Sequence, residues 1–129
     1  MIMMIITTVT MSWFLCGRPC FCFLFHFLFS QVSIGALLLA ERLDGAAGIS
    51  AEVAHRKART SAVTRRPTKF WEDRAKDRPG FLTFPADIML QGGVPLMWQG
   101  ECVGAVGVSG VQSLEDEQIA LAGVAALGT

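Results

Sequence analysis

The stretch that decides the fold is QGGVPLMWQGECVGAVGVSG, residues 91–110. Six of its residues are glycines, and they are spaced through apolar positions instead of being gathered into a linker. The segments VPLMW (94–98) and ECVGAVGV (101–108) have the composition of strands. Between them, Gln99-Gly100 has the form of a two-residue hairpin turn, in which the glycine supplies a positive φ. The stretch therefore predicts an antiparallel β-hairpin.

The glycines of this hairpin need a reason, because glycine weakens the interior of a strand. Gly104 and Gly107 remove side chains, as is expected where a helix, a ligand or another subunit approaches a sheet. Gly92 and Gly93 allow a bend that a residue with a Cβ atom would resist. We therefore expect close neighbours on this hairpin, and any bound molecule or second subunit where the glycines leave room.

Helices and one further strand are expected around the hairpin. The turn signal Asp44-Gly45 closes a predicted strand at 36–42, and the run 81–90 is expected to be irregular because Pro85 interrupts it. The expected helices are 51–66, with Ser50 as N-cap and Pro67 as stop; 69–77, capped by Thr68; and one from Ser113, whose amide Asp116 reaches in a capping box. This order predicts an α+β domain with helices packed on an antiparallel sheet.

The helix at 51–66 carries a stripe of small residues that can lie close against a sheet. Its charged residues Arg56, Lys57 and Arg59 are then expected at the margins of that face or in solvent. The acidic pair at 72–73 and the acidic triplet at 115–117 are likewise interpreted as helix-surface charges.

Composition limits the partners and the compartment. The chain of 129 residues is long enough for one domain with a core, and its eleven basic and eleven acidic side chains cancel. That balance argues against nucleic acid and against an acidic membrane surface as partners. Cys102 is the sole cysteine after residue 31, so the domain has no disulfide framework and is expected to be cytoplasmic.

Residues 1–31 have a different composition, and we divide the chain into this segment and a domain at 32–129. The segment is rich in phenylalanine and has a single charge, Arg18. It resembles a translated pyrimidine-rich tract, which suggests a gene-model artefact; otherwise it is an apolar strand or a membrane segment. Gly17-Arg18-Pro19 breaks the apolar run below the length of a span, so a membrane role is disfavoured. The cysteine spacing fits no zinc or iron–sulfur pattern, so no metal site is expected.

Few residues of the domain carry recognisable chemistry. His55 is its lone histidine and is either an axial iron ligand, a general base, or simply solvated or packed. Met89, Met97 and Cys102 are possible soft ligands, although on strands they more often belong to a core. The loop after the hairpin could hold an anion through its free amides, or be a tight strand-to-helix turn. No complete set of acid, base and nucleophile is present, so the sequence does not decide whether the protein is an enzyme.

Several motifs together resemble one family, over about residues 35–127. They are ERLDGA (41–46), AHRKARTSA (54–62), RPT (66–68), GGVPL (92–96), GECVGAVGVSG (100–110) and DEQIALAG (116–123). The family is the haem-binding or haem-degrading-like domain of the GlcG and HbpS type, also found on some cobalamin adenosyltransferases. Residues at matching positions whose chemistry could face a ligand are Lys57, Thr60 and Ser109. With His55, Gly92, Gly93 and Gly110 they form the predicted cofactor-binding set.

The resemblance implies a profilin-like or PAS-like antiparallel sheet flanked by helices, assembled into homo-oligomers. It also implies binding of haem or a related small ligand in some members, and glycolate utilisation in others. Relative to the family, the first helix and first strand are missing, so the fold is expected to be N-terminally incomplete. Either residues 20–34 substitute as a strand, or the chain is expected to be poorly soluble.

Three functions follow as hypotheses. The first is a small-ligand binding domain in a homo-oligomer, with haem or another tetrapyrrole as the first candidate. The second is an enzyme or accessory protein acting on a small hydroxy acid or on haem. The third is a structural assembly subunit without a ligand.

Overall fold

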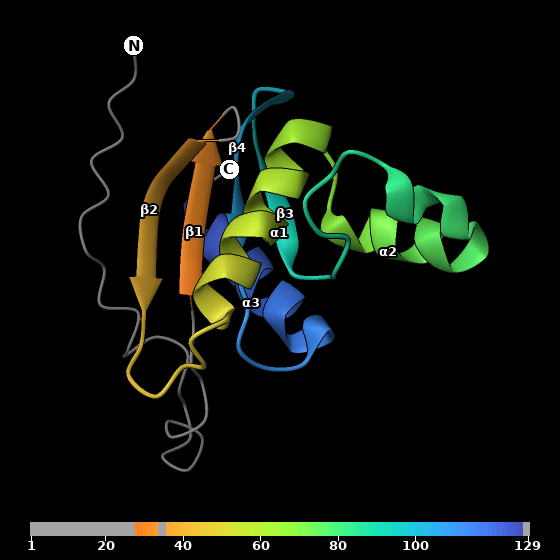
Figure 1. Ribbon diagram of the computed structural model, residues 1–129. Helices are drawn as coiled ribbons and strands as arrows, with labels where there is room; N and C mark the ends of the chain where they lie inside the picture. The colour runs from red at the N-terminus through yellow and green to blue at the C-terminus, as the bar shows by residue number, and fades with distance from the viewer. Residues whose placement is uncertain (1–27, 34–35, 128–129) are drawn as a thin grey trace.

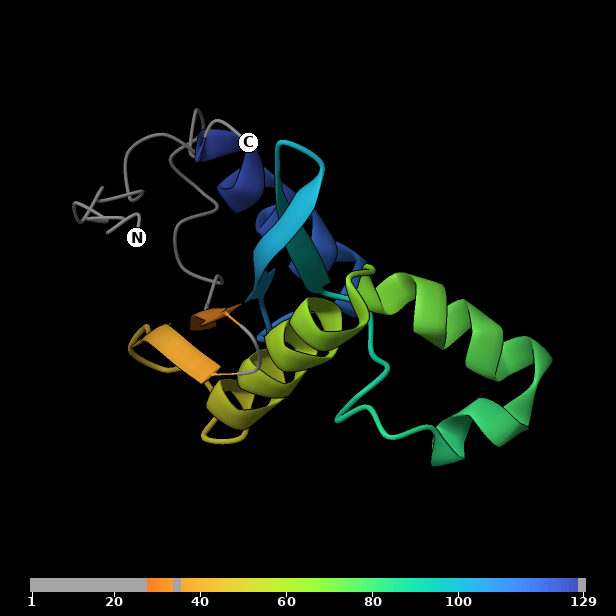
Figure 2. The same cartoon turned by 90° about the horizontal axis from the view of Figure 1, so that it is seen from above.

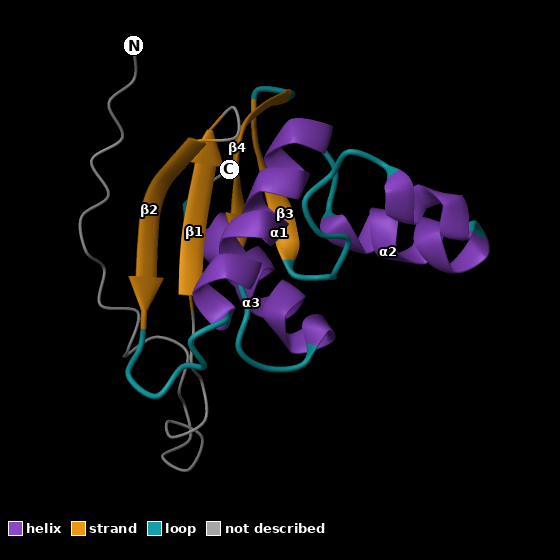
Figure 3. Ribbon diagram, viewed as in Figure 1, coloured by secondary structure: helices purple, strands orange, loops and turns teal. Residues whose placement is uncertain are grey.

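The computed structural model describes residues 28–33 and 36–127 of the chain. Its strands and helices follow the order β1 (Leu28–Ser33), β2 (Ala36–Arg42), α1 (Ser50–Thr64), α2 (Thr68–Asp77), the short 3-10 helix η1 (Pro79–Thr83), β3 (Gly93–Trp98), β4 (Glu101–Gly107) and α3 (Ser113–Ala126). Figures 1 and 3 show the four strands as one sheet with helices packed on it. The predicted α+β class is therefore confirmed.

The sheet is antiparallel throughout, with the strand order β2-β1-β4-β3. The predicted hairpin is β3–β4, and both turn residues have positive φ, 50° at Gln99 and 85° at Gly100. β1 occupies an inner position and pairs with β2 on one side and β4 on the other. A strand therefore does form within the range 20–34, at 28–33, and it crosses the boundary that the sequence suggested at residue 31. The origin of residues 1–31 stays a prediction, and 1–27 lie outside the described residues.

Helices lie on both sides of the sheet (Figure 2). α1 crosses the strands on one face, where its Ala54 and Ala58 are fully buried. α3 packs on β3 and β4, with Ala120 buried against them. The core between these layers is formed by Val94, Leu96, Val106, Val108 and Ala120.

Gly107 explains how α1 comes so near to β4. A Cβ atom at Gly107 would lie 2.6 Å from the Ala58 amide nitrogen and closer still to the carbonyl oxygen of Ala54. These are backbone atoms of the helix, which no change of rotamer can move away. The sequence predicted that a helix, a ligand or another subunit would approach the sheet at this glycine. The structure shows that the neighbour is the helix α1.

All three predicted helix starts are wrong in detail. Thr68, expected as the N-cap of α2, is its first helical residue, and Pro67 takes the N-cap position. Ser50 is the first helical residue, and Ile49 takes the N-cap position. The capping box of α3 is formed by Gln112 and Glu115, with Glu115 accepting from the Gln112 amide at 3.2 Å. It does not use Ser113 and Asp116, because the Asp116 carboxylate is bonded elsewhere. α1 ends two residues earlier than expected, where Arg65 adopts a left-handed conformation with φ of 55°.

α2 and η1 form an arm that projects from the body (Figures 1 and 2). Their aromatic side chains form a cluster in which Trp71 stacks on Phe84 with ring centroids 4.9 Å apart. The Trp71 indole donates to Thr64 Oγ1 at 2.9 Å, which ties the arm to the end of α1. η1 falls within the run 81–90 that the sequence predicted to be irregular. No helix among residues 28–33 and 36–127 is long and apolar enough to cross a membrane.

β2 is an edge strand whose side chains are all exposed. Leu37, Leu38 and Leu39 are 49%, 65% and 41% exposed, so apolar side chains lie on a strand whose outer edge pairs with no other strand among the described residues. Proteins usually protect such edges with charged residues, because a bare edge pairs with other chains.

We expect Leu38→Lys to reduce association of the protein, because a lysine on an edge strand opposes pairing with another strand. Light scattering as a function of protein concentration measures the effect. The matched control is Leu38→Ile, which keeps the apolar edge and should behave like the wild type. Equal scattering from Leu38→Lys and Leu38→Ile would show that β2 does not mediate association.

Candidate functional site

A buried ion pair lies where β3 begins and β4 ends. Lys57 Nζ of α1 is 2.7 Å from Asp116 Oδ2 of α3, and the two side chains are 2% and 3% exposed. The same ammonium donates to the carbonyl oxygen of Val108 at 3.0 Å. Lys57 was expected at the margin of its helix and Asp116 on a helix surface, and both expectations are wrong. The pair connects the two helices that pack on the sheet.

Gly92 and Gly93 make room for this ion pair. Gly92 has φ of 126°, and a Cβ atom there would lie 2.8 Å from Lys57 Nζ and 2.9 Å from Asp116 Cβ. A Cβ atom at Gly93 would collide with the Lys57 carbonyl oxygen and lie 2.7 Å from Thr68 Cγ2. The Gly93 amide donates to Thr68 Oγ1 at 2.8 Å. The space at these two glycines is therefore occupied by side chains and backbone of the same chain.

The loop after β4 is a tight turn into α3. Ser109 is buried, whereas Gly110 is exposed. The amide of Val111 donates to Asp116 Oδ1 at 3.2 Å. The loop therefore binds the Asp116 carboxylate through the Val111 amide, and the same carboxylate pairs with Lys57.

Thr60 and His55 take no part in the ion pair. Thr60 is buried, and its Oγ1 accepts from the amide of Ile88 at 3.1 Å. His55 is half-buried, and its Nδ1 is buried without a hydrogen-bond partner. The structure thus brings together Lys57, Gly92 and Gly93, with Ser109 next to Val108, whose carbonyl accepts from Lys57. His55 and Thr60 do not contribute to this contact.

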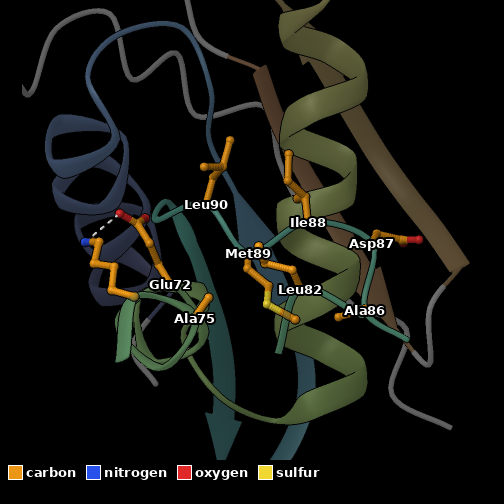
Figure 4. Close-up of a pocket in the computed structure, with 9 residues that line it drawn as sticks. Glu72, Ala75, Leu82, Ala86, Asp87, Ile88, Met89 and Leu90 are labelled. Carbon is orange, nitrogen blue, oxygen red and sulfur yellow. Dashed lines mark ion pairs between the residues drawn. The ribbon is translucent and has the colours of Figure 1, made fainter. Parts of the chain in front are cut away.

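A groove of about 540 Å³ lies between α2 and the segment 82–90 (Figure 4). We call it the α2 groove. Its apolar lining consists of Ala75, Leu82, Ala86, Ile88, Met89 and Leu90. None of the predicted cofactor-binding residues lines it. Met89 lies in a loop and not on a strand, so its side chain contributes to the groove instead of the core.

The polar lining of the α2 groove is already paired. Lys76 Nζ is 3.0 Å from Glu72 Oε1, and Glu72 Oε2 accepts from the amide of Gln91 at 2.7 Å (Figure 4). Burial raises the pKa of Glu72, but the Gln91 amide and the Lys76 ammonium outweigh burial and hold that pKa below the usual value of a glutamate. Asp87 forms an ion pair with Arg59. The groove therefore presents apolar surface with its charges neutralised at the rim.

A second hollow, of about 720 Å³, lies beside η1 and is lined by residues 78–81 and 83–85. All of these except Phe81 are exposed, so this hollow is more open than the α2 groove. Among residues 28–33 and 36–127, no cluster of histidine, cysteine and carboxylate side chains could hold a metal ion.

Residues 31–125 match the family of haem-degrading, HbpS-like proteins. The GlcG protein of Escherichia coli K12 is 45% identical over 76 residues, which are 58% of this chain and 57% of GlcG. The chain thus spans less than two thirds of that curated relative. A crystal structure of an HbpS double mutant from Streptomyces reticuli is 34% identical with a TM-score of 0.74, covering 81% of this chain and 73% of that one. The structure of a PduOC–haem complex is 26% identical with a TM-score of 0.69, covering 78% of each chain.

Proposed function

We propose, from the premise that the chain belongs to the family of haem-degrading, HbpS-like proteins, that it is a small-ligand binding domain for haem or a related tetrapyrrole. The observation that carries this proposal is the similarity to the PduOC–haem complex over 78% of both chains. The other two hypotheses stay predictions. One is an enzyme or accessory protein that acts on a small hydroxy acid or on haem, and the other is a structural assembly subunit without a ligand.

The residues present are compatible with a haem, because nitrogen and sulfur atoms are common ligands of haem iron and the macrocycle needs apolar cover. His55 Nδ1 is buried and unpartnered, so an imidazole is available. Met89 offers a thioether within the apolar α2 groove. Lys57 is engaged in the buried ion pair with Asp116, and Gly92 and Gly93 leave room beside it, which supports a role for these three residues in holding the fold. A bound haem would supply an iron centre, while the chain's own residues would orient the ring and exclude water from it.

We also propose that the protein forms a homo-oligomer in the cytoplasm. The apolar edge of β2, exposed along its whole length, supports self-association. The unpaired Cys102 is in keeping with a reducing compartment.

Titration with hemin tests the haem proposal. We expect a shifted Soret band that saturates as hemin is added, because a specific site is filled at a fixed ratio to the chain. A band that grows linearly without saturation would reflect non-specific association and would refute the proposal.

A further inference from the structure

We propose that the arm formed by α2 and η1 of one copy docks on the β2 end of a second copy of this chain. This inference rests on the homo-oligomer proposed above and adds the contact that holds its subunits together. The arm contributes arginines and aromatic rings, and the β2 end contributes carboxylates and leucines.

The arm carries three arginines that lie over aromatic rings. The Cζ atoms of Arg66 and Arg74 are 4.6 Å and 4.9 Å from the centroid of the Phe70 ring. The Cζ atom of Arg78 is 5.9 Å from the centroid of the Phe81 ring. A guanidinium that lies over a ring keeps the N–H donors in its own plane available for a carboxylate.

Trp71 joins these rings into one surface. Its ring centroid is 5.1 Å from that of Phe70, 6.0 Å from that of Phe81 and 4.9 Å from that of Phe84. Arginine and aromatic side chains are enriched at the centres of protein–protein interfaces. We call the following set the arginine–aromatic surface: Arg66, Phe70, Arg74, Arg78, Phe81 and Phe84.

The arginines of this surface have no carboxylate partner among the described residues. All three are exposed, and none forms an ion pair there. The lysines of the arm differ, because Lys69 pairs with Asp73 and Lys76 pairs with Glu72. Residues 65–78 contain six basic and three acidic side chains, so the arm has an excess of positive charge.

The β2 end, residues 37–44, has the opposite character. Glu41 and Asp44 are exposed, and neither forms an ion pair within the described part of the chain. Leu38 is 65% exposed and adds apolar surface. Arg42 lies between the two carboxylates in sequence, but its Nη1 donates to a backbone carbonyl of the following turn at 2.9 Å. Because neighbouring residues of a strand point to opposite faces, Arg42 does not share a face with Glu41.

The two surfaces lie at opposite ends of the molecule. β2 is the edge strand on one side of the sheet, and the arm projects beyond β3 on the other side (Figures 1 and 2). They cannot meet within one copy, whereas the arm of one copy can reach the β2 end of the next. Every subunit can repeat such a head-to-tail contact. The equal numbers of basic and acidic side chains leave no net charge to keep the copies apart.

Other anionic surfaces fit the arm less well. Glu115 accepts from the Gln112 amide at 3.2 Å, and Glu117 accepts from the side chain of Gln91 at 2.6 Å, so both carboxylates are already bonded. A nucleic acid would be expected to need an excess of basic residues, which the chain does not have. The β2 end therefore combines exposed carboxylates that have no ion pair among the described residues with exposed leucines.

Reversing single charges in the full chain tests the contact. Arg74→Glu reverses a charge on the arm, and Glu41→Arg reverses one on the β2 end. The matched controls are Arg56→Glu and Glu52→Arg, which make the same changes of charge on α1, where the two side chains are 51% and 55% exposed. Each variant is first shown to be folded by circular dichroism. Analytical ultracentrifugation then measures the dissociation constant of the subunits at about 0.1 M and about 1 M salt, between which the Debye length falls from roughly 10 Å to roughly 3 Å.

We expect Arg74→Glu and Glu41→Arg each to weaken association by about tenfold or more, because each places like charges against one another. An equimolar mixture of the two variants should associate like the wild type, since the reversed charge on one arm then meets the reversed charge on the other variant's β2 end. Both controls on α1 should also associate like the wild type. The higher salt concentration should weaken association of the wild type, because the attraction is screened.

Unchanged association of either Arg74→Glu or Glu41→Arg would overturn the inference, although a homo-oligomer would still stand. Weakening in both variants without recovery in their mixture would overturn it as well, because the two reversed residues would then not face each other. A wild type that stays a monomer at every protein concentration would instead refute the proposed homo-oligomer, and the inference with it.

Discussion

Asp116→Ala is expected to lower the free energy of unfolding by about 3–5 kcal/mol, as is typical when one partner of a buried ion pair is removed. The variant leaves the Lys57 ammonium, whose side chain is 2% exposed, with the Val108 carbonyl as its hydrogen-bond partner. It also removes the acceptor of the Val111 amide at the start of α3. Chemical denaturation followed by circular dichroism measures the loss.

Two controls distinguish the effect of leaving a buried charge unpaired from the effect of removing any charged side chain. Glu52→Ala breaks the surface pair with Arg56, whose side chains are 51% and 55% exposed; it should cost at most about 1 kcal/mol. The double variant Lys57→Met with Asp116→Ala should be more stable than Asp116→Ala alone, because no charge is left buried. If Asp116→Ala cost no more than Glu52→Ala, the ion pair would not hold the two helices to the sheet.

Gly107→Ala is expected to destabilise the protein by at least about 3 kcal/mol, at the upper end of the range for overpacked cores. The added methyl group would lie 2.6 Å from the Ala58 nitrogen, so α1 would have to move off the sheet. That movement would also open the buried contacts of Ala54 and Ala58. A loss of this size is a large part of the stability of a small domain, and thermal unfolding would show it as a lowered Tm.

Gly48→Ala is the matched control for Gly107→Ala. A Cβ atom at Gly48 would have nothing within 4 Å, and its φ does not lie in the left-handed region. We therefore expect a change within about 0.5 kcal/mol, as for most surface substitutions. Equal Tm values for the two variants would contradict the close approach of α1 to β4.

The fold could be predicted further from the sequence than the site. The hairpin followed from Gln99-Gly100 and its flanking apolar runs, and the close packing followed from Gly107 and the alanines of α1. These are local signals, because each depends on residues near one another in the chain. The inner position of β1 has no such signal, since pairing with both β2 and β4 is decided by long-range contacts.

The buried pair of Lys57 and Asp116 was missed for a physical reason. Charged side chains are rarely buried unless they are paired, and these partners are 59 residues apart. On its own helix, each looks like a surface charge. The available signal was indirect: Gly92 and Gly93 indicated a close neighbour without identifying it.

The sequence analysis did not predict the α2 groove, because the apolar residues of the segment 82–90 follow neither the helical nor the strand spacing. Leu82, Ile88, Met89 and Leu90 lie in or beside an apolar run broken by Pro85, which was interpreted as a crossing between elements. Apart from the end of η1, this run forms neither helix nor strand, so it cannot bury all of its side chains in a layered core. It is this irregularity that places apolar residues around a surface hollow.

The projecting arm of α2 and η1 has one further consequence. Its links to the body include the bonds of Trp71 to Thr64, of Gly93 to Thr68 and of Gln91 to Glu72. Such links can break together while the four strands remain paired, so the amide protons of the arm would exchange with solvent through local opening, ahead of those in β4. A molecule lodged beneath the arm would slow that exchange there first and leave the rate in the sheet nearly unchanged.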